Sequence, residues 1–251
     1  NPGMAAVAEC VSGISIEDNE AVVAFAEEHA IDLVVIGPEV PLTNGIVDAF
    51  EAAGILAFGP RKAAAELEGS KAFSKGLMKK YGIPTAKYEV FTDAEAAKDY
   101  VRQEGAPIVI KADGLAAGKG VIVAETCDEA LAAVADIMED QEFGAAGNRV
   151  VIEEFMEGEE ASLLCFTDGE TIVPMISSQD HKRAYDGDKG PNTGGMGTYA
   201  PAPVMTPAMI EATKEKILKP VIAAMKQEGR TYQGCLYVGL MITKDGPKVV
   251  E

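Results

Sequence analysis

A lysine- and glycine-rich stretch between two apolar runs carries the clearest chemical signal in this sequence. Residues 111–120 read KADGLAAGKG and join the run 107–110 to the run 121–124, a pattern typical of a β-hairpin. The glycines let the backbone approach a ligand closely, and backbone N–H groups together with Lys111 and Lys119 suit an array of phosphate oxygens. The stretch therefore indicates phosphate binding, with an ordinary flexible hairpin as the alternative.

The hairpin differs from the two best-known nucleotide-binding loops. A Walker A loop needs a glycine where Asp113 stands and a serine or threonine where Gly120 stands. The dinucleotide fingerprint fails because Val123 occupies the position of its last glycine. The hairpin alone thus indicates phosphate binding without naming a class of protein.

The charge balance makes each cluster of cations informative. The 251 residues include 22 Lys and Arg against 40 Asp and Glu, for a net charge of −18 and a pI near 4.5. This balance disfavours nucleic acid or an anionic membrane as the partner, because both need a basic surface. An acidic protein that binds a polyanionic small molecule would instead group a few lysines locally.

The most basic predicted helix runs from about 70 to 81 and carries Lys71, Lys75, Lys79 and Lys80. Ser70 is its expected N-cap. Lys71 lies at the helix N-terminus, where a cation opposes the helix dipole. We expect an anion at the same end to make this tolerable. For Lys79 and Lys80 we expect a solvated face.

Cysteine and histidine usage argues against a metal centre built on these residues. The four cysteines show no metal-ligand spacing, and we expect buried, reduced thiols in a cytoplasmic protein. Only two histidines are present. No run approaches the roughly 18 apolar residues of a membrane span, and no signal peptide is visible. The chain starts at Asn1 and stops inside an apolar run, so both ends look cut.

The elements that must position these groups follow an α/β pattern. Helix 17–30, strand 32–37, helix 45–53 and strand 55–58 suggest part of a doubly wound unit, with strand 32–37 parallel and buried on both faces. Residues 88–166 have the pattern β-α-β-β-α-β of a small sandwich. A long polar loop at 177–199 mixes cations, carboxylates and glycines, which favours a functional role. A helix over 206–227 and a terminal hairpin follow.

A nucleoside triphosphate would need four kinds of group, and the sequence offers a candidate for each. Lysines would neutralise the phosphates, a strand end would hold the purine, one carboxylate would bind the ribose and another would carry magnesium. The candidate lysines are Lys71, Lys111 and Lys119, and the candidate strand end is Glu153, Glu154, Phe155 and Met156. Glu160 is the candidate for the ribose and Glu251 the candidate for magnesium. No Ser-His-Asp set, Cys-His pair or zinc motif is present, so we expect electrostatic and positional chemistry.

Six stretches in this order resemble the phosphoribosylamine–glycine ligases, also called glycinamide ribonucleotide synthetases. They are IGPEVPL at 36–42, GSKAF at 69–73, VIKADGLAAGKG at 109–120, IEEFMEGEE at 152–160, QDHK at 179–182 and GPNTGGMG at 190–197. The hairpin by itself indicates only the ATP-grasp superfamily, whereas the last two stretches are more specific. The likeness covers essentially the whole chain.

The resemblance implies a reaction and a set of site residues. ATP would phosphorylate glycine, and 5-phosphoribosylamine would attack the glycyl phosphate to give glycinamide ribonucleotide, ADP and phosphate, with Mg²⁺ or Mn²⁺ as the metal. Lys111, Asp180 and Lys182 would be catalytic. The expected ATP-binding residues are Lys71, Lys111, Gly118, Lys119, Gly120, Glu153, Glu154, Phe155, Met156 and Glu160. Those expected to bind glycine and phosphoribosylamine are Asp180, Lys182, Asn192, Thr193, Gly194, Gly195 and Met196. Glu251 would bind metal.

The resemblance also implies a domain layout. Residues 1–66 would be a partial Rossmann-like domain without its first strand. Residues 67–251 would be an ATP-grasp domain, with a lid at about 88–158 and a central lobe at 159–251. The family's glycine-rich G-G-R-E-H-A loop is absent and its E-F-N-x-R-F-G-D-P motif stops at Glu251, so we expect no turnover from these 251 residues alone. Monomer and dimer both stay open.

Two other functions fit the same residues. One is a different ATP-grasp carboxylate–amine ligase, such as a formate- or bicarbonate-using enzyme. The other is a nucleotide-binding module without turnover. A panel of acids and amines would separate the first from the glycine ligase, and Lys111→Ala would separate the second.

Overall fold

The computed structural model describes residues 2–116, 120–140, 144–187 and 189–251. The chain divides into two compact units, Asn1–Ala65 and Glu66–Glu251. Within the described residues, no helix has the length and apolar character needed to cross a membrane.

The first unit holds a short 3₁₀ helix and a two-stranded parallel sheet with helices on one face. The 3₁₀ helix η1 covers Pro2–Ala6; β1 (Leu33–Val35) pairs with β2 (Leu56–Phe58) in parallel, as expected. The helices are α1 (Asn19–Glu28), α2 (Glu39–Asn44) and α3 (Ile46–Ala52). Phe50, Ile46 and Val47 of α3 form the core with Ala26 of α1.

Burial of β1 on both faces was a wrong expectation. Leu33, Val35 and Leu56 are 56%, 66% and 70% exposed, whereas Val34, Ile36 and Ala57 pack on the core. Successive side chains of a strand point to opposite faces. In the described residues the core of this unit covers only one of those faces.

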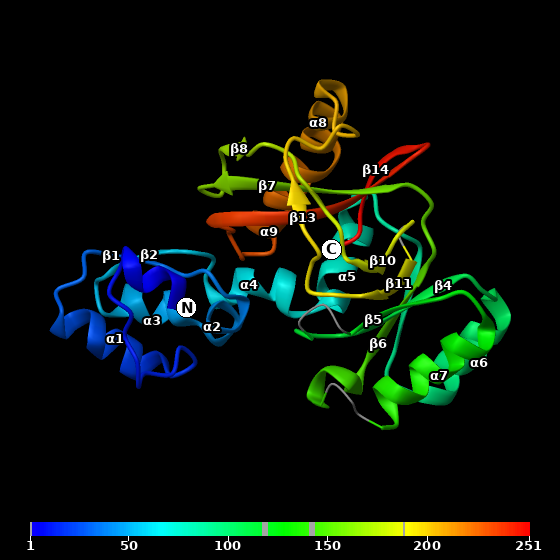
Figure 1. Ribbon diagram of the computed structural model, residues 1–251, viewed down its shortest axis with the longest axis horizontal. Helices are drawn as coiled ribbons and strands as arrows, with labels where there is room; N and C mark the ends of the chain where they lie inside the picture. Colours follow the sequence, from blue (N-terminus) through cyan, green and yellow to red (C-terminus); the bar gives the residue numbers. More distant parts are fainter. Residues whose placement is uncertain (1, 117–119, 141–143, 188) are drawn as a thin grey trace. The chain divides into compact units, whose positions relative to one another are not determined.

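The boundary between the two units falls within α4 (Lys62–Gly69). The second unit continues with α5 (Lys71–Tyr81), followed by an antiparallel sheet. The sheet has the order β3-β6-β4-β5 and is formed by β3 (Tyr88–Phe91), β4 (Ile108–Ala112), β5 (Val121–Ala124) and β6 (Val150–Glu154). Helices α6 (Ala94–Glu104) and α7 (Cys127–Met138) lie side by side on one face (Figure 1), and the 3₁₀ helix η2 (Gly144–Asn148) precedes β6. The fully buried Val101, Ile110, Val134, Ile137 and Ile152 join helices and sheet.

A second antiparallel sheet has the order β14-β13-β7-β8. Its strands are β7 (Glu159–Thr167), β8 (Ile172–Pro174), β13 (Gly234–Thr243) and β14 (Gly246–Val249). The expected sandwich over 88–166 was too long, because β7 pairs with β13 in this second sheet. In chain order, β6 is therefore the last strand of the first sheet. The loop 177–199 contains four short strands, β9 (Gln179–Asp180), β10 (Arg183–Tyr185), β11 (Lys189–Asn192) and β12 (Thr198–Tyr199).

The helix expected over 206–227 has a π-helical turn inside it. It consists of α8 (Pro207–Thr213), the π turn η3 (Lys214–Leu218) and α9 (Lys219–Gln227). Proline lacks the N–H that an α-helical turn requires, and Pro220 is the second residue after the π turn.

The four cysteines are free thiols in this structure, and the expected burial holds only in part. Cys165 is buried and Cys127 and Cys235 are partly buried, but Cys10 is exposed because it lies in a segment without helix or strand.

Candidate active site

Three charged side chains meet in the interior between α5 and the first sheet. Lys75 Nζ lies 2.9 Å from Glu153 Oε2, and Lys111 Nζ lies 3.0 Å from Glu153 Oε1. The three residues are only 2–3% exposed. The neighbouring strands β4 and β6 carry Lys111 and Glu153, and α5 adds Lys75 from a third element. Two cations therefore share one buried carboxylate.

This buried cluster is tied to the end of the second sheet. Lys111 Nζ donates to the carbonyl oxygen of Val250 at 2.9 Å. Lys75 Nζ donates to Thr85 Oγ1 at 2.6 Å, which donates in turn to the carbonyl oxygen of Val249 at 2.7 Å. Burial lowers the pKa of Lys75 to about 8, with Lys111 adding to the effect and Glu153 opposing it. The cluster thus fixes Lys111 beside the residue that precedes Glu251.

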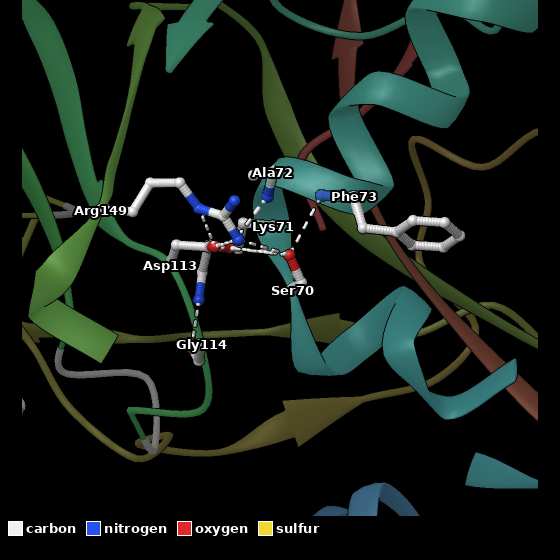
Figure 2. Close-up of polar contacts among 7 residues, drawn as sticks. All are labelled: Ser70, Lys71, Ala72, Phe73, Asp113, Gly114 and Arg149. Atoms are coloured by element: carbon white, nitrogen blue, oxygen red, sulfur yellow. Dashed lines mark hydrogen bonds and ion pairs between the residues drawn. The ribbon is translucent and has the colours of Figure 1, made fainter. Parts of the chain in front are cut away.

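Lys71 lies at the N-terminus of α5, beside the base of the hairpin (Figure 2). Its Nζ donates to the carbonyl oxygen of Gly114 at 2.7 Å. Burial and the charge of Lys111 lower the pKa of Lys71, against the influence of Glu251. The anion expected at this helix end is present within the protein itself, because Asp113 Oδ1 accepts from the backbone N–H of Ala72 at 2.9 Å.

A recess in the second sheet gathers polar side chains from several strands. Lys182 Nζ pairs with Glu251 Oε1 at 2.8 Å, and Tyr237 Oη lies 3.2 Å from Ser162 Oγ. Glu160, Asp180 and the backbone at Gly239 complete this lining. The sequence-predicted residues Glu160, Asp180, Lys182 and Glu251 are therefore brought together here.

The charges of the surrounding lysines influence the ionisation of Glu251. Burial alone would raise the pKa of Glu251, but Lys182, Lys111 and Lys71 together hold it below its usual value. Burial alone would lower the pKa of Lys182, and Glu251 reverses this so that the pKa lies above its usual value. Lys111 is in addition fixed by its hydrogen bond to the carbonyl oxygen of Val250, the residue before Glu251.

The glycine-rich loop after β11 folds back onto the segment of Lys182. Thr193 donates to the carbonyl oxygen of Lys182 through its N–H at 2.7 Å and its hydroxyl at 2.8 Å. Met196 N–H donates to the carbonyl oxygen of His181 at 2.7 Å, although the Met196 side chain is exposed. Gly195 needs its positive φ of 114°, and an added Cβ would lie 3.1 Å from Asp180 Oδ1. Gly194 is exposed and has open space around it.

The remaining predicted site residues lie in several different parts of the fold. Asn192 pairs through its backbone with Arg183. At the end of β6, Glu154 accepts from the N–H of Lys87 at 3.0 Å, Phe155 is 38% exposed and Met156 is partly buried. Gly120 is buried against Ala112 and Ala116. Gly118 and Lys119 lie outside the described residues.

Sequence reasoning gave no role to several residues that the fold brings to the site. Lys75 shares a helix face with Lys71, a spacing of four residues that could have marked it in so acidic a chain. Arg149 directly precedes β6 and Tyr237 lies inside an apolar run, and neither position carries a local signal.

The carboxylates fit a metal held jointly with a nucleotide. Among the described residues, no group of three or more His, Cys, Asp or Glu could hold a metal ion. Glu160 and Glu251 both line the recess. Mg²⁺ is commonly bound by one or two carboxylates, with phosphate oxygens and water completing its octahedron. Glu251 suits that arrangement, whereas a cage of protein ligands is not built from these residues.

Residues 88–154 and 159–249 each form an α+β lobe with a four-stranded antiparallel sheet. Lys111 on β4 of the first lobe is hydrogen-bonded to Val250, which follows β14, the last strand of the second lobe. This arrangement defines an ATP-grasp fold. Solved structures agree. The biotin carboxylase domain of Hydrogenobacter thermophilus 2-oxoglutarate carboxylase, in complex with MgADP and bicarbonate, has a TM-score of 0.74 at 20% identity, covering 96% of this chain and 52% of that one.

The family follows from sequence models. The phosphoribosylglycinamide synthetase N domain matches residues 1–68, and the ATP-grasp (A) domain of the same synthetase matches residues 69–251. The chain therefore belongs to the phosphoribosylglycinamide synthetase family, as its motifs suggested.

Named relatives are similar along the whole chain. The phosphoribosylamine–glycine ligases of Halalkalibacterium halodurans and Agrobacterium fabrum are 57% and 59% identical over all 251 residues. The crystal structure of the Thermotoga maritima phosphoribosylamine–glycine ligase has a TM-score of 0.72 at 38% identity, covering 78% of this chain and 49% of that one. The chain spans 58% and 59% of the length of the first two relatives.

Proposed function

We propose that the natural protein containing this chain joins glycine to 5-phosphoribosylamine at the expense of ATP. The γ-phosphoryl group of ATP is transferred to a glycine carboxylate oxygen, giving glycyl phosphate and ADP. The amine of phosphoribosylamine then attacks the acyl carbon, a C–N bond forms as the C–O bond to phosphate breaks, and phosphate leaves with glycinamide ribonucleotide as product. This is a step of purine biosynthesis, and we expect it in the cytoplasm.

One observation supports this proposal above the others: Lys111 Nζ donates to the carbonyl oxygen of Val250 at 2.9 Å and Lys182 Nζ pairs with Glu251 Oε1 at 2.8 Å, so cations from two separate segments meet at adjacent residues. Several cations at one place in a protein of net charge −18 suit a triphosphate. The relatives that match this chain end to end carry the name of the same ligase.

The residues would divide the work by position. Lys71 and Lys111 would bind the phosphates and stabilise charge on the phosphoryl group in transfer, while Gly118, Lys119 and Gly120 would cover them. Residues 153–156 would hold the adenine and Glu160 the ribose. Asp180, Lys182 and the loop 192–197 would orient glycine and phosphoribosylamine. When bound, Mg²⁺ or Mn²⁺ would neutralise phosphate charge, with Glu251 as its ligand.

The test is glycine-dependent ADP release by the natural protein, run against a panel of carboxylic acids and amines. We expect ADP only when glycine and phosphoribosylamine are both present. Release with another acid and not with glycine would favour a different carboxylate–amine ligase. Lys111→Ala should reduce turnover by at least about 100-fold, the size seen when one electrostatic donor is removed. Unchanged turnover in that variant would rule out a catalytic role for the hairpin.

A further inference from the structure

A carboxylate and a guanidinium lie at the junction of the hairpin base with α5 (Figure 2). The Asp113 side chain is 5% exposed. Its Oδ1 accepts from the N–H of Ala72 at 2.9 Å and from Ser70 Oγ at 3.1 Å. Its Oδ2 accepts from Arg149 Nε at 2.5 Å and is also paired with Arg149 Nη2. Every oxygen of this carboxylate is therefore committed to neighbouring segments.

Arg149 connects the same carboxylate to the strand that carries Glu153. Its carbonyl oxygen accepts from the N–H of Asp113 at 3.0 Å, and its Nη2 lies 3.4 Å from Ser70 Oγ, the N-cap of α5. Two nitrogens of the Arg149 guanidinium, Nε and Nη2, converge on Oδ2 of Asp113, and hydrogen bonds between ionised groups are stronger than those between neutral ones. A carboxylate at a helix N-terminus is also favoured by the helix dipole. The pair thus joins α5, the hairpin base and the start of β6.

The two lysines expected to bind phosphate depend on this junction. Lys71 Nζ donates to the carbonyl oxygen of Gly114, the residue after Asp113, and Lys111 lies two residues before it. The hairpin base has little room to shift, because a Cβ added to Gly114 would lie 2.9 Å from Ala146 Cβ. A change at Asp113 would therefore move the partner of Lys71 and the strand end of Lys111 together.

We propose that Asp113, held by Arg149, is a positioning residue for nucleotide binding, which keeps Lys71 and Lys111 directed at one phosphate group. The inference rests on the proposed function only in taking a nucleotide as the ligand. Asp113 also supplies the anion that makes a lysine tolerable at the N-terminus of α5. Neither residue needs to contact the nucleotide for this role.

The experiment measures binding of a non-hydrolysable ATP analogue with Mg²⁺ to the natural protein by calorimetry. Asp113→Asn keeps the shape and an acceptor for the N–H of Ala72 but removes the charge that Arg149 binds. We expect it to weaken analogue binding at least about tenfold. Glycine KM should stay near wild type, whereas the midpoint of thermal unfolding should fall because a largely buried ion pair is lost, so binding is measured well below that midpoint. Arg149→Met should have a similar effect, and the double variant should bind no worse than the weaker single one, because the two act as a unit.

An exposed pair of the same chemistry provides the control. Arg102 Nη1 lies 2.6 Å from Asp99 Oδ1 on α6, with the two side chains 51% and 76% exposed. Asp99→Asn and Arg102→Met should leave analogue binding unchanged. Should Asp113→Asn fail to fold, Arg149→Lys keeps the charge and loses the fork, and should weaken the analogue without altering glycine KM.

The inference is overturned if Asp113→Asn, or Arg149→Lys where the first does not fold, binds the analogue as tightly as wild type. It is also overturned if glycine KM rises by the same factor, since that would reflect general loss of structure. Binding is measured without turnover. If the wild-type protein binds the analogue but ligates no glycine, the proposed function is therefore contradicted and this inference still holds.

Discussion

Lys75 Nζ and Glu153 Oε2 lie 2.9 Å apart with their side chains 3% and 2% exposed, so the ion pair between them is almost fully removed from water. Lys111 lies 3.0 Å from the other oxygen of the same carboxylate. A buried charge is tolerated when it is paired, and here one glutamate compensates two lysines. The glutamate is thus the residue on which the burial of Lys111 depends.

This relationship predicts unequal costs for removing its members. Glu153→Gln would leave two buried ammonium groups without a carboxylate and should lower the free energy of unfolding by about 3–5 kcal/mol. Lys75→Met would leave Glu153 paired with Lys111, with no net charge, and would keep a side chain of similar length. It should lower the free energy of unfolding by roughly 1–2 kcal/mol. Urea unfolding gives both values. Lys79→Met, at a side chain 67% exposed, is the control. Equal costs for the two buried variants would contradict this picture.

The same cluster predicts a pH dependence of stability. The pKa of Lys75 is about 8 in the folded protein, mainly because of burial, against about 10.4 in an unfolded chain. Between these values the unfolded state binds more protons, so raising the pH favours folding. The free energy of unfolding of wild type should therefore rise, relative to that of Lys75→Met, by about 1 kcal/mol per pH unit from pH 8 to 10. A flat difference across this range would argue that Lys75 has an ordinary pKa.

Position 239 is predicted to accept only glycine. A Cβ there would lie 2.9 Å from Glu251 Cγ and 3.3 Å from Tyr237 Oη, so Gly239→Ala should displace Glu251 from Lys182. Glycine-dependent ADP formation should fall by at least about tenfold, a loss of 1.4 kcal/mol in transition-state binding. Gly76→Ala, on the exposed face of α5 with nothing within 4 Å, should instead stabilise the protein by about 0.5–1 kcal/mol. Full activity of Gly239→Ala would show that the recess can rearrange.

Lys182 should matter for chemistry more than for nucleotide binding. Its ammonium group compensates Glu251, and its segment carries Asp180 and anchors Thr193. Lys182→Met should therefore reduce turnover by about 100-fold or more while changing ATP-analogue affinity by less than about threefold. Steady-state kinetics and calorimetry measure the two effects. An equal loss in both would place Lys182 among the nucleotide-binding residues.

Local patterns predicted many elements closely, because capping and periodicity act over a few residues. Ser70 caps α5, as predicted. The parallel pairing of β1 with β2 was also correct. The sequence did not predict the short helices α2 and α4, or the short strands within 177–199. Their stability depends on contacts made far along the chain rather than on their own propensity.

The candidate site was also predictable only in part from the sequence. The kinds of residue were predictable, since lysines and glycines with these spacings suit phosphate and the ordered motifs indicated the family. Their partners were not. The strand order β3-β6-β4-β5 places Glu153 beside Lys111, and the β13-β7 pairing helps to form the recess around Lys182 and Glu251.

The sequence by itself determined the charge balance, the glycine- and lysine-rich hairpin, most of the helices and strands, and the family. Only the tertiary structure decided which charges are buried and which ones share a partner. The burial of Lys75, the anion at the N-terminus of α5 and the contact of Asp113 with Arg149 are examples. Periodicity and capping are properties of neighbouring residues, whereas the energy of a charge depends on the solvent and the opposite charges that the folded chain places around it.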